Sequence, residues 1–435
     1  MGVNHNIRYL KSLEAVRERA HEVLRRAEQG QLRHFEYDAS KVDSVAEVVY
    51  ALIERDYGSV SKVPMHGRWR SYCIGGRDLV SEHVTRWRGA DVSEWECARR
   101  IIDLFMVSVL IDAGAGSAWT FRDTEFGAMQ RTEGLGLAAL RMFESGVFSS
   151  AENPFQVDAL ALEALDDQAL EQGFQVSAEN PLPGCKNRAQ LLRSLGRALR
   201  TEPQYFGGIC ACNKHPARPG FMLDYLTGCA ESARAVSIDD VWTVVVDGLA
   251  SVWPASRTKL DGVALGDVWQ CDTLASDQQG GEPMPGVHSL VPFHKLSQWL
   301  TWSLLEVITQ LARFTVSGTE RLTGLPEYRN GGLLVDMGVL TLTPAARARS
   351  PQAIPQFDTA DPVIVEWRAM TVALLDVVAQ RVKNLSGLDD NQVPPMFLSR
   401  VLEGGTWKAG REIAVALRGE SRDPPINIIS DGTVF

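Results

Sequence analysis

The sequence lacks three features that would point to common functional classes. No uninterrupted apolar run approaches the roughly 20 residues that a membrane span needs. There is no basic excess, because 44 Lys and Arg residues stand against 54 Asp and Glu residues, a formal net charge of −10. Binding to nucleic acid or to an anionic membrane regardless of sequence needs a basic face, so neither is an expected partner. Residues 1–9 show no apolar signal core, and we expect a cytoplasmic protein.

Signals for a disulfide frame, a metal or a dinucleotide are also weak. The seven cysteines, at 73, 97, 185, 210, 212, 229 and 271, form an odd, scattered set that is typical of reduced thiols. Cys210, Cys212 and His215 offer three zinc ligands without a fourth at the usual spacing, so ordinary loop thiols are favoured while a metal stays open. Gly114 and Gly116 lack the third glycine of a dinucleotide fingerprint. We expect no metal and no organic cofactor.

What the sequence does contain is helical periodicity. Apolar residues recur at steps of three and four from Leu10 to Ala27, with Arg and Glu between them. The segment from Val363 to Val382 is apolar on nearly every face, which predicts a central buried helix. Ser40 is a candidate cap for another helix. Alternating strand patterns are scarce, so the predicted fold class is mainly α.

The length and the turn signals predict two helical lobes. A chain of 435 residues exceeds the range over which one hydrophobic core usually keeps growing. Asn-Pro pairs at Asn153 and Asn180 mark turns on either side of a short helical stretch. We therefore predict an N-terminal lobe at 1–150, a connection at 151–187 and a C-terminal catalytic lobe at 188–435.

The segment from Phe293 to Glu306 carries ionisable side chains among tryptophans. Lys295 and Glu306 are 11 residues apart, which places them within roughly 20° of one face of a helix. Gln298 and Trp302 lie near the same stripe. Exposing tryptophan to water is costly, so the pattern favours a pocket wall. The alternative, surface charges with tryptophans packed on the other lobe, stays open.

The segment from Leu325 to Asp336 places an acid, an aromatic and a base directly after a proline. Glu306 and Glu327 border a short stretch of chain, 307–326, that returns near its starting point. Paired carboxylates suit glycosidic or amide hydrolysis, because one stabilises positive charge or acts on water while the other protonates the leaving group. The alternative is that Glu327 and Arg329 are helix-start charges in an ion pair.

The segment from Met65 to Tyr72 is a compact cluster of cations and aromatics. Arg68 and Arg70 could grip a phosphate or carboxylate through two hydrogen bonds each. The alternative is a solvated basic turn. His66 by itself is typical of a structural histidine.

Five longer motifs are spread along the chain: His66-Gly-Arg-Trp-Arg, Asp112-Ala-Gly-Ala-Gly, Arg218-Pro-Gly-Phe-Met-Leu-Asp-Tyr225, Pro292-Phe-His-Lys-Leu-Ser-Gln-Trp-Leu-Thr and Leu322-Thr-Gly-Leu-Pro-Glu-Tyr-Arg-Asn-Gly-Gly. Together they resemble, over essentially the whole chain, the family of uracil-catabolism protein four. The resemblance implies a pathway in which uracil enters as a nucleotide and its ring is opened. For this member it implies cleavage of the resulting ribosylurea, or its phosphate, to urea and ribose or ribose phosphate.

The C-terminal half also resembles, more distantly, the queuosine-salvage N-glycosidases, which implies their helical fold, similar to that of DNA glycosylases. The likeness lies in Phe293-His-Lys-Leu-Ser-Gln298 and Glu327-Tyr-Arg329, among other landmarks in the same order. Glu327 stands where that family has an acid. Ser303 stands where it has a second aspartate, so Glu306, three residues further on, is the candidate replacement.

Both resemblances imply cleavage of a ribosyl C–N bond, for which we assign roles. Glu327 is expected to stabilise positive charge or act as base, and Glu306 to be the acid or to bind a sugar hydroxyl. The side chains expected to contact the ribosylated substrate are His66, Arg68, Arg70, Arg257, His294, Lys295, Gln298, Trp302, Tyr328, Arg329, Asn330 and Asp336. Amide hydrolysis of an open-ring ureido compound, and a scaffold or nucleotide sensor without catalysis, are the alternatives.

Overall fold

The computed structural model describes residues 5–112, 114–116, 118–208, 216–230, 234–254, 257–275 and 287–429. Helices take up 59% of the described residues, and the strands among these residues form only two-stranded pairs. The prediction of a mainly α fold is confirmed. Within these ranges, no helix has the length and apolar character needed to cross a bilayer. Cys210, Cys212 and His215 lie outside the described residues.

The described chain forms two compact units, each assembled from segments that are not consecutive in the sequence. The first unit draws on 5–66, 257–298 and 319–429, and the second on 67–254 and 299–318. The connection predicted at 151–187 lies within the second unit and contains two helices, α7 (Ala159–Ala164) and α8 (Asp167–Gly173). The predicted division into lobes at 1–150 and 188–435 with a connection at 151–187 is a different partition, and it stays a prediction.

The first unit is built mainly from helices. They are α1 (His5–Leu10), α2 (Leu13–Glu28), α3 (Val42–Tyr57), α14 (Tyr328–Asp336), α15 (Pro344–Arg349), α16 (Pro362–Leu385), α17 (Phe397–Val401), the π-helix η9 (Leu402–Thr406) and α18 (Trp407–Arg418). Its strand pairs are β1 (Phe35–Tyr37) with β12 (Leu340–Leu342), β7 (Lys259–Leu260) with β8 (Val263–Ala264), β9 (Val268–Gln270) with β10 (Leu290–Pro292), and β13 (Gln356–Asp358) with β14 (Asn427–Ile429).

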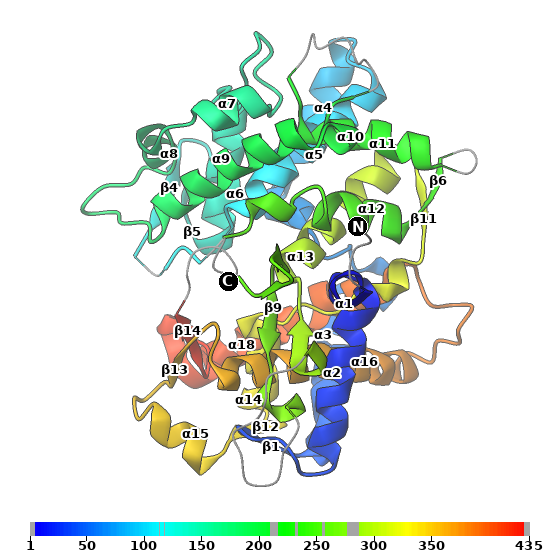
Figure 1. Ribbon diagram of the computed structural model, residues 1–435, viewed down its shortest axis with the longest axis vertical. Coiled ribbons are helices and arrows are strands. Elements are labelled where there is room, and N and C mark those ends of the chain that lie inside the picture. Colours follow the sequence, from blue (N-terminus) through cyan, green and yellow to red (C-terminus); the bar gives the residue numbers. More distant parts are fainter. Residues whose placement is uncertain are drawn as a thin grey trace. The chain divides into compact units, whose positions relative to one another are not determined.

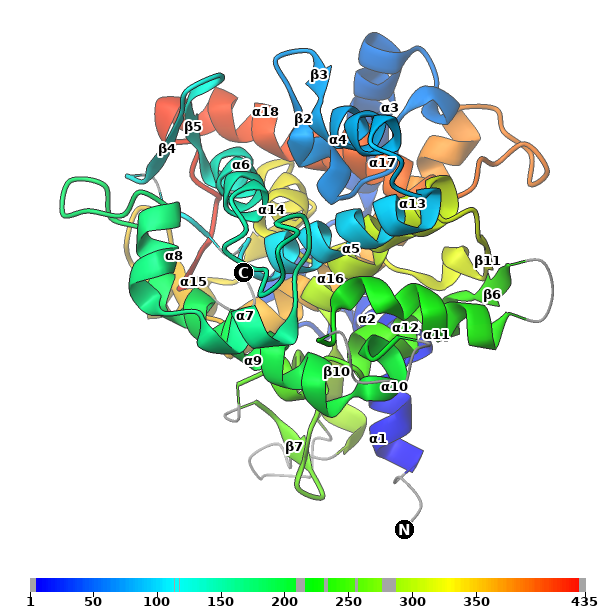
Figure 2. The ribbon, with the colours of Figure 1, turned by 90° about the horizontal axis from the view of Figure 1, so that it is seen from above.

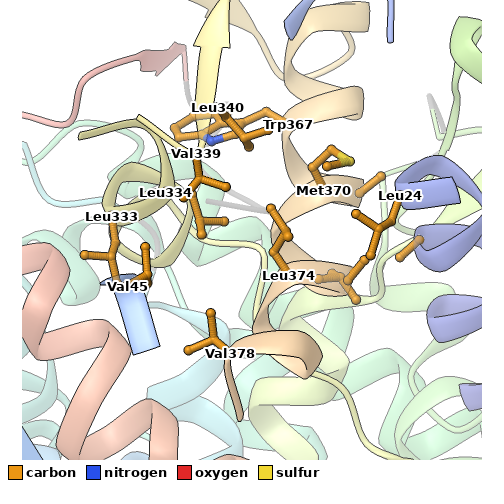
Figure 3. Close-up of a cluster of buried hydrophobic side chains, with 14 of the residues drawn as sticks. Leu24, Val45, Leu333, Leu334, Val339, Leu340, Trp367, Met370, Leu374 and Val378 are labelled. Atoms are coloured by element: carbon orange, nitrogen blue, oxygen red, sulfur yellow. The ribbon is translucent and has the colours of Figure 1, made fainter. Parts of the chain in front are cut away.

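The core of the first unit surrounds α16, which confirms the predicted central helix. Sixteen residues of α16 are buried, and α2 and α3 pack against it. α2 and α16 lie side by side in both ribbon views (Figure 1, Figure 2). Figure 3 shows Trp367, Met370 and Leu374 of α16 facing side chains of α2 and α14. A Cβ on Gly331 of α14 would meet the Trp367 ring at 2.8 Å, so glycine allows this close approach.

Local sequence explains where several helices of the first unit begin. The periodic segment predicted as one helix is interrupted before Leu13, because the Ser12 hydroxyl caps α2 by accepting a hydrogen bond from the Ala15 amide. The prediction for Ser40 is wrong. Asp38 accepts hydrogen bonds from the amide and the hydroxyl of Ser40, while α3 begins after Lys41 without a side-chain cap.

The second unit is also mainly helical. Its helices include η3 (Arg68–Tyr72), α4 (Leu79–Gly89), α5 (Glu94–Leu110), α6 (Arg131–Glu144), α7, α8, α9 (Cys185–Thr201), α10 (Pro203–Phe206), α11 (Met222–Cys229) and α12 (Ile238–Val246). Its strand pairs are β2 (Cys73–Ile74) with β3 (Arg77–Asp78), β4 (Thr120–Asp123) with β5 (Gly127–Gln130), and β6 (Ala235–Ser237) with β11 (Thr315–Ser317).

Capped amphipathic helices define the second unit. Ser93 caps α5, whose residues from Ile101 to Leu110 are all buried. α7 packs along α9, as both ribbon views show (Figure 1, Figure 2). α13 (Lys295–Gln310) contributes its first turn to the first unit and the rest of its length to the second.

Candidate active site

The carboxylate of Glu327 lies at the N-terminus of α14. Its Oε2 accepts a hydrogen bond from the Arg329 amide at 2.8 Å, and its Oε1 accepts one from the Asn330 amide at 2.5 Å. Burial raises the pKa of Glu327 above its usual value, while these two amides and the charges of Lys295 and Arg329 act in the opposite direction. Glu327 thus caps its helix, as the alternative of a helix-start charge predicted, and also offers a half-buried carboxylate.

Lys295 is held at the start of α13 by a buried ion pair. Asp267 accepts a hydrogen bond from the Lys295 amide at 2.9 Å and two from the Arg368 guanidinium at 2.9 and 2.8 Å. The side chains of Asp267 and Arg368 are 1% and 2% exposed. Burial would raise the pKa of Asp267, but Arg368 and the other donors hold that pKa well below its usual value. The ion pair therefore fixes the helix turn that carries Lys295.

Gln298, one turn further along α13, is fully buried. Neither its Nε2 nor its Oε1 has a hydrogen-bond partner among the described residues. The hydroxyl of Thr323, four residues before Glu327, is likewise fully buried and without a partner in the described chain. Most buried polar groups in folded proteins are paired, so these three atoms call for an explanation.

His294 and Arg257 are buried in the first unit and contact other protein groups. The Nε2 of His294 lies 2.8 Å from the Leu10 carbonyl, and burial lowers the pKa of the ring. The neutral imidazole can therefore donate this hydrogen bond. Arg257 stacks over the Trp269 ring, with 5.3 Å from its guanidinium carbon to the ring centre. Substrate contact by either residue stays a prediction.

Three predicted binding residues of α14 have their side chains engaged within the protein. Arg329 donates to the Arg422 carbonyl at 2.9 Å and lies over the Tyr328 ring. Asn330 donates to the Leu325 carbonyl at 3.1 Å and accepts from Thr406 of η9 at 2.9 Å. These contacts orient the N-terminal turn of α14 around Glu327. Ligand contact by Tyr328, Arg329 and Asn330 stays a prediction.

Asp336, at the other end of α14, forms an ion pair with Arg418. The two guanidinium nitrogens lie 2.8 and 2.5 Å from its carboxylate oxygens. The pair joins α14 to α18, and it gives Asp336 a structural partner. Substrate binding by Asp336 stays a prediction.

His66 forms a close pair with Glu403 of the π-helix η9. Its Nδ1 lies 2.5 Å from the Glu403 carboxylate, and its ring centre lies 6.1 Å from that of Trp407. Glu403 and Trp407 also line an open groove of about 520 Å³ beside α18. Thr406, the last residue of η9, does not line this groove. Its hydroxyl donates a hydrogen bond to Asn330, so η9 connects the His66 pair to the turn that carries Glu327.

In the second unit, Glu306 of α13 is paired with Arg70. The Arg70 guanidinium lies 2.6 Å from Glu306 Oε1, and the Glu306 side chain is 4% exposed. The side-chain amide of Gln310 donates a hydrogen bond to the same oxygen at 3.3 Å. Glu306 and Lys295 thus both lie on α13, as predicted, and Glu306 has a cationic partner that sequence spacing did not reveal.

Arg68 and Trp302 are also buried in the second unit. Arg68 donates to the Ser108 carbonyl at 2.7 Å and forms an ion pair with Asp112 at 2.9 Å. Its side chain is 0% exposed, so the geometry favours a structural role, and anion binding stays a prediction. The indole nitrogen of Trp302 is buried and has no hydrogen-bond partner in the part of the chain that is described.

One group among the described residues has ligand atoms close enough to share a metal ion: His34, Asp272 and Glu366. Glu366 Oε1 accepts from the amides of His34 and Phe35, each at 2.9 Å, and Oε2 accepts from the Arg33 amide and the Thr273 hydroxyl. A carboxylate offers about four lone-pair sites, and these four donors use them. Glu366 is therefore an anchor for the start of β1.

Comparison with known proteins identifies the family. The family described as "Protein of unknown function (DUF1688)" matches residues 9–435. The chain belongs to this family. It is 41% identical over 455 residues to "Uracil catabolism protein 4" of Lachancea kluyveri, with 100% of both chains covered. It is 40% identical over 434 residues to "Protein urg3" of Schizosaccharomyces pombe, with 98% of each covered.

These relatives confirm the family resemblance read from the motifs. The distant likeness to the queuosine-salvage N-glycosidases stays a prediction. Three residues that shape the site were not predicted from the sequence: Asp267, Arg368 and Thr323. Arg368 lies in a buried stretch of α16, and its partner Asp267 comes 101 residues earlier in the sequence.

Proposed function

We propose that this protein is an N-ribosyl hydrolase of uracil catabolism that cleaves ribosylurea, or its 5′-phosphate, to urea and ribose or ribose phosphate. The observation that carries the proposal is the half-buried carboxylate of Glu327, fixed by two backbone amides and electrostatically coupled to Lys295. Support for the pathway comes from the 41% identical relative, whose printed name is a uracil catabolism protein.

The chemistry assigns Glu327 to the developing positive charge. As the ribosyl C–N bond breaks, its electron pair leaves with nitrogen, and the anomeric carbon becomes electron-poor. An ionised carboxylate held beside that carbon stabilises the transition state and can accept a proton from water. In the net reaction the hydroxyl of water adds to the anomeric carbon, and its proton ends on the nitrogen of urea.

Glu306 is the second acid of the proposal. Its Oε1 accepts a charge-assisted hydrogen bond from Arg70, which favours an acceptor over a proton donor. We therefore assign it to a sugar hydroxyl. Replacement by Gln should raise KM more than it lowers kcat, because hydroxyl binding contributes to the ground state as well.

The assay for the proposal follows urea release from ribosylurea and from its 5′-phosphate. We expect urea from one of the two at a rate that scales with enzyme concentration. Release from neither form at high enzyme concentration would remove the substrate assignment. The same assay decides the alternatives, since amide hydrolysis yields ammonia and carbon dioxide with the sugar still attached. A sensor would bind without any product.

A further inference from the structure

Two fully buried amide side chains of the first unit differ in their hydrogen bonding. Asn330 is fully buried, and both ends of its amide are paired, with Leu325 and with Thr406. Gln298 is equally buried, yet neither amide atom has a partner in the described chain. A buried polar group without a hydrogen-bond partner destabilises the folded state, so the unpaired amide of Gln298 lowers stability, unlike the paired amide of Asn330.

Gln298 is held rigidly in this state. It lies three residues after Lys295, on the same face of the first turn of α13. Its backbone amide donates to the His294 carbonyl at 2.8 Å, and the Lys295 amide is fixed by Asp267. The carboxamide is therefore presented by a turn whose backbone is anchored, as a preorganised binding group requires.

The neighbourhood is that of the candidate active site. Lys295 is close enough to Glu327 to lower the pKa of that carboxyl. The segment that leads into Glu327 carries Thr323, a second fully buried side chain with an unpartnered polar atom among the described residues. Gln298 and Thr323 thus offer three unused hydrogen-bonding atoms on the two segments that also supply Lys295 and Glu327.

A carboxamide presents an N–H donor and a C=O acceptor side by side. Its complement is a ligand edge with the same two groups in reverse order, –NH–C(=O)–, which a buried amide can bind through two parallel hydrogen bonds. We infer that Gln298 binds such an edge through these two hydrogen bonds, so the ligand of this site is a ureido compound or a pyrimidine imide. This inference rests on the proposed function for the choice of site, and it specifies the leaving group.

Two variants and a control separate recognition from structure. Gln298→Met keeps the volume and removes both hydrogen-bonding atoms, while Gln298→Glu keeps the acceptors and removes the donor. Replacing an unpaired buried amide by an apolar group should leave the melting temperature unchanged or raise it. Gln380→Met, at an exposed position on α16, is the matched control. A structural Gln298 would instead give a lower melting temperature in Gln298→Met than in the control.

Binding is measured without turnover, by ligand-observed NMR on the full chain. The probes are N-methylurea and uracil, which carry the –NH–C(=O)– edge, and tetramethylurea and ribose, which do not. We expect the wild type and Gln380→Met to bind the first two, and both Gln298 variants to bind them at least about 10-fold more weakly, since each lost paired contact leaves a polar partner unsatisfied. Equal binding by Gln298→Met and the wild type would overturn the inference, as would binding of tetramethylurea as tight as that of N-methylurea.

The kinetic assay keeps this result distinct from the proposed function. If the wild type binds both probes through Gln298 but releases no urea from ribosylurea, the inference holds and the reaction assignment fails. If the wild type releases urea and Gln298→Met retains its kcat/KM within about threefold, the reaction assignment holds and the inference fails.

Discussion

At the scale of single residues, Glu327 combines two tasks that usually compete. A carboxylate that caps a helix accepts backbone hydrogen bonds best when it is ionised, and burial opposes that ionisation. Here the amides of Arg329 and Asn330 hold both carboxylate oxygens in place. The same contacts that fix the start of α14 therefore fix the position of the proposed catalytic carboxylate.

The raised pKa of Glu327 predicts the acid side of the pH profile. An ionised carboxylate is required, so kcat/KM should fall as the pH drops through the pKa of Glu327, which burial raises above its usual value. Lys295→Met removes a charge that lowers this pKa, so the midpoint of the fall should move to higher pH. The check is kcat/KM against pH, with Lys259→Met, an exposed lysine of β7, as control. An unchanged midpoint in Lys295→Met would show that the fall of kcat/KM at low pH is caused by the titration of a group other than Glu327.

Single-residue roles were partly predictable from the sequence. The segments around Glu327 and Lys295 stood out because ionisable and aromatic residues lay close together along the chain. The burial of Arg68 could not be predicted from the sequence, because its partner Asp112 comes 44 residues later and only the folded chain brings the two together. Residue type reveals which groups can react, whereas their neighbours in space decide which of them remain available.

At the scale of elements, the start of α13 depends on the Asp267–Arg368 pair. Asp267→Asn leaves Arg368 buried without its counter-charge, which should lower the free energy of unfolding by about 3–5 kcal/mol. Because the pKa of Asp267 is depressed in the folded state, its stabilisation is complete above its unfolded pKa of about 3.9 and is lost only below it. The loss should therefore be the same at pH 6 and pH 8.

The effect is measured by unfolding in guanidinium chloride. Urea is avoided as the denaturant because it is a product of the proposed reaction. Asp390→Asn is the control, because Asp390 is 93% exposed and pairs with Lys383 at the surface. That change should leave the free energy of unfolding close to that of the wild type. A loss in Asp267→Asn as small as that in the control would mean that the buried pair does not anchor α13.

The π-helix η9 is the second element with a specific packing requirement. A Cβ on Gly405 would lie 2.4 Å from a methyl group of Val49 in α3, so Gly405→Ala should destabilise the protein by about 1–3 kcal/mol through overpacking. Gly89→Ala, at the exposed end of α4 with nothing within 4 Å, is the matched control and should be neutral or slightly stabilising. Thermal unfolding distinguishes the two. Equal melting temperatures would show that η9 can shift away from α3.

Elements were more predictable than their ends. The apolar run that predicted a central helix is α16, because residues apolar on every face can only be buried. The N-terminal periodicity was also correct, but the break at Ser12 was not foreseen, since a hydroxyl cap interrupts a helix without interrupting its apolar spacing. At Ser40 a cap was predicted where the structure has none, because the amide and the hydroxyl of Ser40 both donate hydrogen bonds to Asp38.

At the scale of the whole molecule, chain order is a poor guide to organisation. The first unit combines residues from the beginning, middle and end of the sequence, so no single turn or proline cluster marks its boundary. Local periodicity predicted what does not depend on how the segments combine, namely the mainly α class. The predicted absence of nucleic-acid and membrane partners and the cytoplasmic location remain predictions, and no oligomeric state was predicted.

The proposed reaction depends on Glu327 acting on the substrate. The measurement that tests this most directly is kcat/KM for urea release by Glu327→Gln, with melting temperatures alongside and Glu54→Gln, an exposed position of α3, as control. We predict a loss of at least about 100-fold in Glu327→Gln, because a charge-stabilising group is removed, and wild-type activity in Glu54→Gln. A folded Glu327→Gln enzyme whose kcat/KM stays within about threefold of wild type would contradict the account.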